Sequence, residues 1–318
     1  MSLKQEPTLS WKRLLLVSTR GALTALAATA LSLAWTHTAH AQAPAPTPAP
    51  NLDFSVPTSA FIVPSLGQNT LFTESQNINI VRSEAGPLLV RPIEPESDSF
   101  STSLEYETWD SGVVQGFNRV SGDRVTGLFH FVRGRRDDTE VSLTVPIQNV
   151  SIDNLGSSSG IGDVRVAFRK YFFNVEDPEG LTIVASLRGS ISTGSETRAI
   201  GLGRSTAGPS LAFYKPFSNT LMVYGGGGID FSFGSSLGLR LKNTPYGWFG
   251  AVNRFSERFG IKAEANFFNS AFDESYARIM IAPQLYLSPT QIVQLSLRRE
   301  LRAVGRPTAI SVGYSSQF

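Results

Sequence analysis

Apolar and small polar side chains alternate along the last eleven residues of the chain, 308–318. Successive side chains of a β-strand point to opposite faces, so this alternation predicts a strand with one apolar face. Its other face carries only alanine, glycine, serine and glutamine. An apolar outer face over a small, polar inner face is typical of the lipid-facing wall of an outer-membrane barrel. The apolar face consists of Ile310, Val312, Tyr314 and Phe318.

Segments with strand character recur from residue 100 onward, separated by turn residues. Val141, Leu143 and Val145 alternate with polar neighbours in this way. A soluble β-sandwich alternates similarly with its apolar face inward, so alternation alone leaves both folds open. We predict twelve strands, at 100–109, 124–132, 139–148, 161–173, 180–193, 205–216, 220–233, 245–254, 259–270, 276–287, 291–301 and 307–318.

The connections between these strands alternate in length. Outer-membrane barrels have short periplasmic turns and longer outside loops, and an even strand count places both barrel ends on the periplasmic side. In the last two hairpins every connection is short. We therefore predict an antiparallel up-and-down barrel. The predicted outside loops are 110–123, 149–160, 194–204 and 234–244, and the predicted turns are 133–138, 174–179, 217–219 and 255–258.

The first 41 residues have the pattern of a secretory signal peptide. Four basic residues precede an apolar stretch at 21–35, and Ala39-His40-Ala41 provides a cleavage site that leaves Gln42 as the first mature residue. The alternative is an uncleaved anchor, but the apolar stretch is too short to span a bilayer. The leader and the terminal strand together favour a Gram-negative outer-membrane barrel over a soluble sandwich.

Composition excludes several classes of function. Removing the leader takes away four basic residues and one acidic residue, so the formal charge changes from +2 to −1. The mature protein therefore lacks the basic character expected of a nucleic-acid partner. Because the chain contains no cysteine, disulfides, thiol nucleophiles and cysteine metal sites are excluded. We expect no cofactor and no metal site.

The segment between the leader and the first strand, 42–99, is rich in proline. Its start, 43–50, alternates alanine or threonine with proline, and this predicts a semi-rigid extended linker. Residues 51–99 contain only short apolar pieces, which leaves a periplasmic extension, a plug inside the barrel or disorder as alternatives. The predicted organisation is a signal peptide at 1–41, a linker and periplasmic extension at 42–99, and a barrel at 100–318.

Two glycine-containing motifs lie in the middle of the barrel segment. Gly160-Ile161-Gly162-Asp163-Val164 opens a strand that ends in Lys170-Tyr171, and Ser192-Thr193-Gly194 ends the next strand. With these motifs, residues 124–318 resemble the outer-membrane family associated with meta-pathway phenol degradation and a broader group of transporter barrels. The resemblance implies a barrel that passes small, often apolar or aromatic compounds, and it implies no catalytic residues.

The glycine motifs of the barrel segment match no catalytic or nucleotide-binding site. The letters of Gly160 to Asp163 also occur in intramembrane aspartyl proteases, but those enzymes need two aspartates on membrane helices. Gly201-Leu202-Gly203 precedes a strand and lacks the third glycine of a dinucleotide site. The run from Gly225 to Gly228 lacks the Lys-Ser or Lys-Thr of a phosphate loop, so we expect it to relieve crowding in the barrel wall.

Strand parity predicts which charged side chains face the interior. Unpaired charges are costly in a narrow interior, so we expect these residues to pair across strands and constrict the bore. They either brace the barrel or act as a selective filter. The predicted inward acids are Glu105, Glu107, Glu140, Asp163, Asp230, Glu264 and Glu300, and the predicted inward bases are Arg165, Arg169, Arg188, Lys262, Arg278 and Arg298.

His130 is the only histidine outside the leader. Phe129 and Phe131 on either side of it predict that the imidazole faces the interior. A lipid-modifying barrel enzyme pairs a histidine with a serine and an orienting polar group. No such cluster is visible around His130, so we interpret it as structural or as part of the interior lining.

The sequence therefore predicts an outer-membrane channel for small solutes rather than an enzyme. Its expected partners are membrane lipid, a small solute and the barrel-assembly machinery, which recognises a terminal aromatic such as Phe318. The alternatives are a lipid hydrolase that uses His130 and a barrel with a structural or adhesive role. The modest predicted loops disfavour adhesion.

Overall fold

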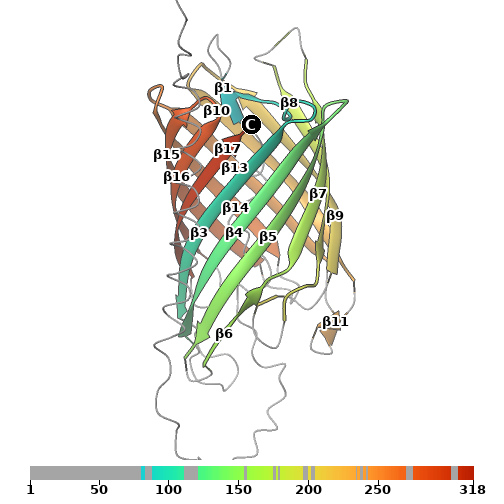
Figure 1. Cartoon of the computed structure of the whole chain (residues 1–318), viewed down its shortest axis with the longest axis vertical. Helices are drawn as coiled ribbons and strands as arrows, with labels where there is room; N and C mark the ends of the chain where they lie inside the picture. The colour runs from blue at the N-terminus through green and yellow to red at the C-terminus, as the bar shows by residue number, and fades with distance from the viewer. Residues whose placement is uncertain are drawn as a thin grey trace, which may run out of the picture. The chain divides into compact units, whose positions relative to one another are not determined.

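A computed structural model of the chain contains one large antiparallel sheet that closes into a barrel (Figure 1). The predicted signal peptide and the proline-rich linker lie outside the described residues. The structure describes residues 80–82, 88–110, 121–153, 156–174, 177, 180–195, 200–201, 205–233, 235–236, 239–240, 243–269, 275–301 and 307–318.

The large sheet contains thirteen strands in the described part of the chain, and β6 and β7 are two pieces of one barrel strand, because both pair with β5. The barrel therefore has twelve strands, which confirms the prediction. These strands are β3 (Asp98–Asp110), β4 (Ser121–Arg135), β5 (Thr139–Ile152), β6 (Gly156–Ile161), β7 (Val164–Phe172), β8 (Thr182–Ile191), β9 (Ser205–Pro216), β10 (Leu221–Phe233), β13 (Thr244–Arg254), β14 (Phe259–Asn269), β15 (Ser275–Ser288), β16 (Gln291–Glu300) and β17 (Thr308–Gln317).

Four further short strands form two separate hairpins. β1 (Ile80–Arg82) pairs with β2 (Leu88–Val90) just before the barrel begins. β11 (Ser235–Ser236) pairs with β12 (Leu239–Arg240) within the connection between β10 and β13.

The first and last barrel strands close the ring. β17 pairs with β3 from Thr308 opposite Thr108 to Gln317 opposite Ser99. Asp98 and Phe318 also exchange two backbone hydrogen bonds, each 2.9 Å long. The chain therefore enters and leaves the barrel at the same end, which we call the entry end; the opposite end is the far end.

One predicted loop is wrong. Residues 149–160 were expected to form an outside loop, but β5 continues to Ile152 and β6 begins at Gly156, and these two pieces pair with each other. The sequence of β6 is Gly-Ser-Ser-Ser-Gly-Ile, which has no apolar alternation. Its strand structure comes from pairing with β5, and pairing leaves no signal in a polar, serine-rich sequence.

The two faces of the wall differ as expected for a membrane barrel. Large apolar side chains cover the outer surface, among them Phe168, Leu211, Phe249 and Ile310. Most inward positions are buried and carry polar, charged and aromatic groups. This is the arrangement that a lipid-facing wall requires. No helix in the described residues is long and apolar enough to cross a membrane.

The backbone geometry of the turn between β4 and β5 explains why two aspartates occur there. Asp137 and Asp138 have φ angles of 61° and 52°. Two consecutive residues with positive φ form the type I′ geometry that continues the twist of a hairpin, and aspartate tolerates this geometry better than most residues.

Candidate functional site

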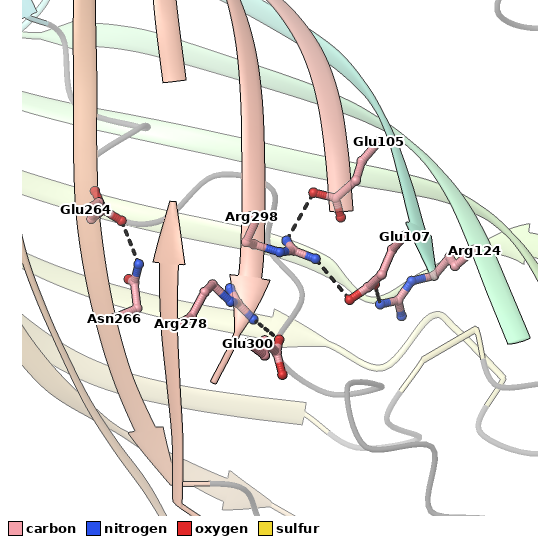
Figure 2. A network of polar contacts seen from close by, with 8 residues as sticks. All are labelled: Glu105, Glu107, Arg124, Glu264, Asn266, Arg278, Arg298 and Glu300. Atoms are coloured by element: carbon pink, nitrogen blue, oxygen red, sulfur yellow. Dashed lines mark hydrogen bonds and ion pairs between the residues drawn. The ribbon is translucent and has the colours of Figure 1, made fainter. Parts of the chain in front are cut away.

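Six charged side chains form an ionic network inside the barrel toward the far end (Figure 2). Arg298 Nη1 lies 3.0 Å from Glu105 Oε2, and Arg298 Nη2 lies 3.0 Å from Glu107 Oε1. Glu107 also forms an ion pair with Arg124. Arg278 Nη2 lies 2.8 Å from Glu300 Oε1. Three carboxylates thus balance three guanidinium groups, and the network is electrically neutral.

A small residue allows Arg298 to reach across the wall. Arg298 on β16 pairs in register with Ala309 on β17, and Ala309 in turn pairs with Glu107 on β3. The guanidinium group therefore extends over a methyl group to reach a carboxylate two strands away. The alanine that looked like an unremarkable inner-face residue in the last strand provides the space for this ion pair.

A second group of charges in the barrel interior is an ion pair that joins β8 and β10. Arg188 donates to Asp230 through Nε at 3.1 Å and through Nη2 at 2.8 Å, which is the bidentate geometry of strong carboxylate pairs. Its guanidinium carbon also lies 3.8 Å from the centre of the Tyr246 ring. The Arg188 side chain keeps 27% of its surface exposed, more than any base in the ionic network.

A third group of charges lies nearer the entry end. Glu140 accepts a hydrogen bond of 2.7 Å from the Tyr171 hydroxyl, and Arg169 Nη1 lies 3.8 Å from the same carboxylate. Glu264 accepts hydrogen bonds from Tyr224 at 2.8 Å and from Asn266 at 2.9 Å. Lys262 lies 3.5 Å from Glu264. These carboxylates are buried and are compensated by donors: Glu140 by groups on the adjacent strand β7, and Glu264 by groups on its own strand and on β10.

Four aromatic side chains form what we call the aromatic column, which consists of Tyr214, Tyr224, Tyr246 and Trp248. Tyr214 and Tyr224 stack with ring centres 5.6 Å apart, and Tyr246 and Trp248 stack with ring centres 5.9 Å apart. The interplanar angles are 21° and 11°, so the rings within each pair are nearly parallel. Trp248 and the tyrosines 214 and 224 belong to one buried apolar cluster, and Tyr246 packs against it.

Glycines opposite three of the four rings let these rings pack close against the wall. Tyr224 pairs with Gly250, Gly226 pairs with Trp248, and Gly228 pairs with Tyr246 along the β10–β13 ladder. Three consecutive inward pairs of this ladder thus combine a glycine with an aromatic residue. A Cβ on Gly226 would lie 2.6 Å from the indole, and one on Gly250 would lie 2.5 Å from the Tyr224 hydroxyl.

The two sequence motifs that carry the family resemblance contact each other. Thr193 Oγ1 donates to the Gly162 carbonyl at 2.6 Å and accepts from the Val164 amide at 3.0 Å. The Gly194 amide donates to Asp163 Oδ1 at 3.1 Å. Asp163 lies between β6 and β7 and therefore links this interruption of the strand to the residues that follow β8.

His130 faces the interior, as the neighbouring phenylalanines predicted, and is almost fully buried. Its Nδ1 lies 2.8 Å from Thr144 Oγ1 on β5. Both residues are covered by interior packing rather than placed at the barrel rim, so a lipid ester has no access to them in this arrangement. Among the described residues no group of three or more acidic or histidine side chains is placed to hold a metal ion.

The structure brings most of the predicted interior charges into three groups and separates a few others. Asp163 is a wall contact, and Arg165 is half-buried on β7 between Thr144 on β5 and Ser190 on β8. Sequence reasoning missed Arg124, although its parity within β4 places it inward. It also missed the aromatic column, because glycines on β10 and β13 conceal the alternation of these strands.

Comparison with known proteins identifies the fold. No family model matches this chain, and no curated protein matches it. Solved structures do match. An outer membrane channel from Pseudomonas putida F1 has a TM-score of 0.61 at 14% identity, with 72% of this chain and 97% of that chain covered. The chain therefore has the fold of an outer-membrane channel barrel.

Two further solved structures show weaker similarity. The NanC porin has a TM-score of 0.49 at 9% identity, covering 69% of this chain and 100% of that chain. The P. putida toluene transporter TodX has a TM-score of 0.42 at 8% identity, covering 70% of this chain and 91% of that chain.

Proposed function

We propose that this protein is a passive channel for small solutes in the outer membrane of a Gram-negative bacterium, and that planar apolar or aromatic solutes are its preferred class. The observation that carries the proposal is the closed twelve-stranded barrel with an apolar exterior and an interior that combines neutralised charges with a stacked aromatic column. The channel from P. putida F1, which has the same fold, supports it.

The aromatic column supports the solute class. The rings of the column are buried or partly buried in the interior, and a planar apolar solute that passes between them would stack favourably on their π faces. The charges beside the column are paired, as Arg188 is with Asp230, so they create no strong preference for an ion. Two sequence motifs, Gly160 to Val164 and Ser192 to Gly194, resemble those of the phenol-degradation family. This resemblance points to the same class of solute.

The location and route of the protein complete the proposal. The signal peptide exports the chain, the barrel-assembly machinery recognises the last strand ending at Phe318, and the entry end faces the periplasm. The linker and extension predicted at 42–99 lie on the periplasmic side, up to the start of β3 at Asp98. No step of this function requires a cofactor, a metal ion or catalysis.

The channel function is tested by transport through the purified barrel. In planar bilayers we expect small conductance steps, because the ionic network and the aromatic column occupy much of the interior. Liposomes that contain the barrel should take up toluene or phenol faster than empty liposomes, and faster than they take up a sugar of similar size. No conductance and no accelerated uptake would contradict the channel function and leave a structural role.

A pair of tryptophan variants tests the solute class. Trp248 belongs to the aromatic column, whereas Trp109 is equally buried on β3 and packs against Val150 outside the column. Trp248→Leu is expected to lower toluene uptake several-fold, and Trp109→Leu is expected to leave it unchanged. Equal effects of the two variants on uptake would show that the aromatic column does not select the solute.

A further inference from the structure

The short segment just before the first barrel strand is held inside the entry end. We call residues 90–97 the mouth segment. Val90 and Ile93 are almost completely buried, although they lie in a proline-rich stretch outside the barrel sheet. Val90 belongs to the same buried apolar cluster as Tyr171, Tyr214 and Tyr224. The mouth segment therefore occupies space at the entry end of the aromatic column.

Backbone contacts fix the mouth segment against two barrel strands. The Ile93 amide donates a 2.7 Å hydrogen bond to Glu140 Oε1 at the start of β5. The Glu96 amide donates to the Gly134 carbonyl at 3.3 Å, and the Gly134 amide donates to the Ser97 carbonyl at 3.0 Å. Glu140 thus binds the mouth segment with one oxygen and the Tyr171 hydroxyl with the other.

The mouth segment packs against the wall at Gly134, near the end of β4. The carbonyl oxygens of Ile93 and Glu94 lie so close to Gly134 that a Cβ on this residue would collide with both. Only glycine allows the mouth segment to approach the wall at this point. Gly127, seven positions earlier in the same strand, has no such restriction, because a Cβ there would meet no atom closer than 3.9 Å.

The mouth segment is preorganised for this contact. Pro92 and Pro95 fix the backbone on both sides of Ile93 and carry no amide hydrogen, so little chain entropy is lost when the segment docks. Arg91 stacks on Phe173 with 4.0 Å between its guanidinium carbon and the ring centre. Partial burial lowers the pKa of Arg91, and the negative charge of nearby Asp138 offsets this only in part; an arginine remains a cation after such a shift.

We propose that the mouth segment is a gate: seated, it closes the entry end by placing Val90 in the aromatic cluster, and an apolar solute that reaches this end of the column displaces it. The gate rests on the proposed function, because it presumes that solutes travel along the column. Val90 and the solute compete for the same aromatic surface, and they exclude each other there. The docked contacts are few and are made by one short segment, so they can open without disturbing the barrel ladders.

Single-channel recording in planar bilayers tests the gate with a matched glycine pair. Gly134→Ala is expected to unseat the mouth segment and raise the open probability several-fold. Gly127→Ala is the control in the same strand and should behave as wild type. Ile93→Ser, which removes the buried side chain without touching the barrel wall, should reproduce the effect of Gly134→Ala.

A crosslink tests the closed state. Because the chain has no cysteine, the pair Arg91→Cys and Phe173→Cys can be joined selectively with a bifunctional methanethiosulfonate. Joining the pair should abolish conductance, and a reductant should restore it. If the crosslinked pair conducts like wild type, or if Gly134→Ala and Ile93→Ser, shown to be folded by heat modifiability, leave the open probability unchanged, the gate is disproved while the channel stands.

A labelling experiment separates failure of the gate from failure of the channel. A single cysteine in Val90→Cys should react slowly with a maleimide when the segment is seated. The reaction should become at least several-fold faster in the Gly134→Ala background or with phenol present, and it should remain slow with Gly127→Ala. Fast labelling in every background would show that the segment is not seated, whatever the transport assays report. Slow labelling that phenol does not accelerate would overturn displacement by solute.

Discussion

Gly226 lies directly opposite Trp248 on the inner wall, and a Cβ on Gly226 would approach Cζ2 of the indole to 2.6 Å and the Leu211 carbonyl to the same distance. The indole therefore occupies the volume that a side chain on β10 would otherwise fill. This relationship explains why a run of four glycines is compatible with a stable barrel strand. On the inner face, rings from β13 take the place of the side chains that Gly226 and Gly228 lack.

Replacing Gly226 with alanine should consequently destabilise the barrel. The added methyl group collides with both the indole and a backbone carbonyl, and overpacking of this kind costs about 1–3 kcal/mol. The free energy of unfolding in lipid vesicles, measured by denaturant titration, would report the loss. Gly247→Ala is the control, since its Cβ would meet only the Gly226 carbonyl oxygen at 3.4 Å. Equal stability of the two variants would contradict the packing described for the indole.

Arg298 should be essential for stability, because two buried carboxylates depend on it. Arg298 is 6% exposed and forms ion pairs with Glu105 and Glu107. Arg298→Gln leaves these acids without their shared cation, and removing one partner of a buried ion pair costs about 3–5 kcal/mol.

The control for Arg298 is an exposed ion pair in the same barrel. Arg133 and Asp98 are 65% and 46% exposed and lie 4.0 Å apart. Arg133→Gln should change the free energy of unfolding by less than about 1 kcal/mol, because exposed pairs contribute little. If the two glutamine variants lose the same stability, the ionic network does not support the barrel.

The terminal phenylalanine should affect assembly more than stability. Its side chain is 72% exposed, whereas its backbone closes the barrel through two hydrogen bonds with Asp98. Phe318→Ala keeps those bonds, so the folded protein should unfold at the same temperature as wild type. Its yield in the outer membrane, measured as heat-modifiable barrel, should fall if the aromatic ring is the recognition signal. An unchanged yield would argue against that signal.

His130 should not support lipid hydrolysis. The imidazole contacts Thr144 within the packed interior, where phospholipid cannot reach it. The purified barrel should hydrolyse phospholipid at the background rate, and His130→Ala and Thr144→Ala should leave that rate unchanged. A wild-type activity that both substitutions abolish, in barrels that remain folded, would establish the hydrolase instead.

The strands were predictable because apolar and polar residues alternate with a period of two, which is a strong signal wherever one face of a strand is apolar. All twelve predicted segments overlap strands of the barrel, and the inward position of charges such as Glu105 and Arg298 followed from parity alone. The pairing of those charges did not follow. Arg298 and Glu107 are separated by 191 positions, and only the closure of the ring through β17 brings them together.

The parts that escaped prediction lack a periodic signal. On β10, glycines at both faces conceal the alternation, so the aromatic column opposite them looked like ordinary strand residues. The polar sequence of β6 conceals a strand for the same reason. The mouth segment has no period at all, because prolines and single apolar residues fit an unstructured linker as well as a docked one. Its burial depends on Gly134 and Glu140, which lie about forty positions further along the chain.

The short tether of the mouth segment sets the kinetics of closure. Only residues 94–97 separate Ile93 from Asp98, the first residue of β3. An extended chain spans about 3.3–3.6 Å per residue, so a displaced Ile93 stays within roughly 18 Å of the strand to which it is joined. Such a tether keeps the local concentration of the segment in the millimolar range or above. Reclosure is then a first-order event, seen as brief flickering at a rate independent of protein concentration, and a free peptide of the same sequence at micromolar concentration cannot compete with the tethered copy.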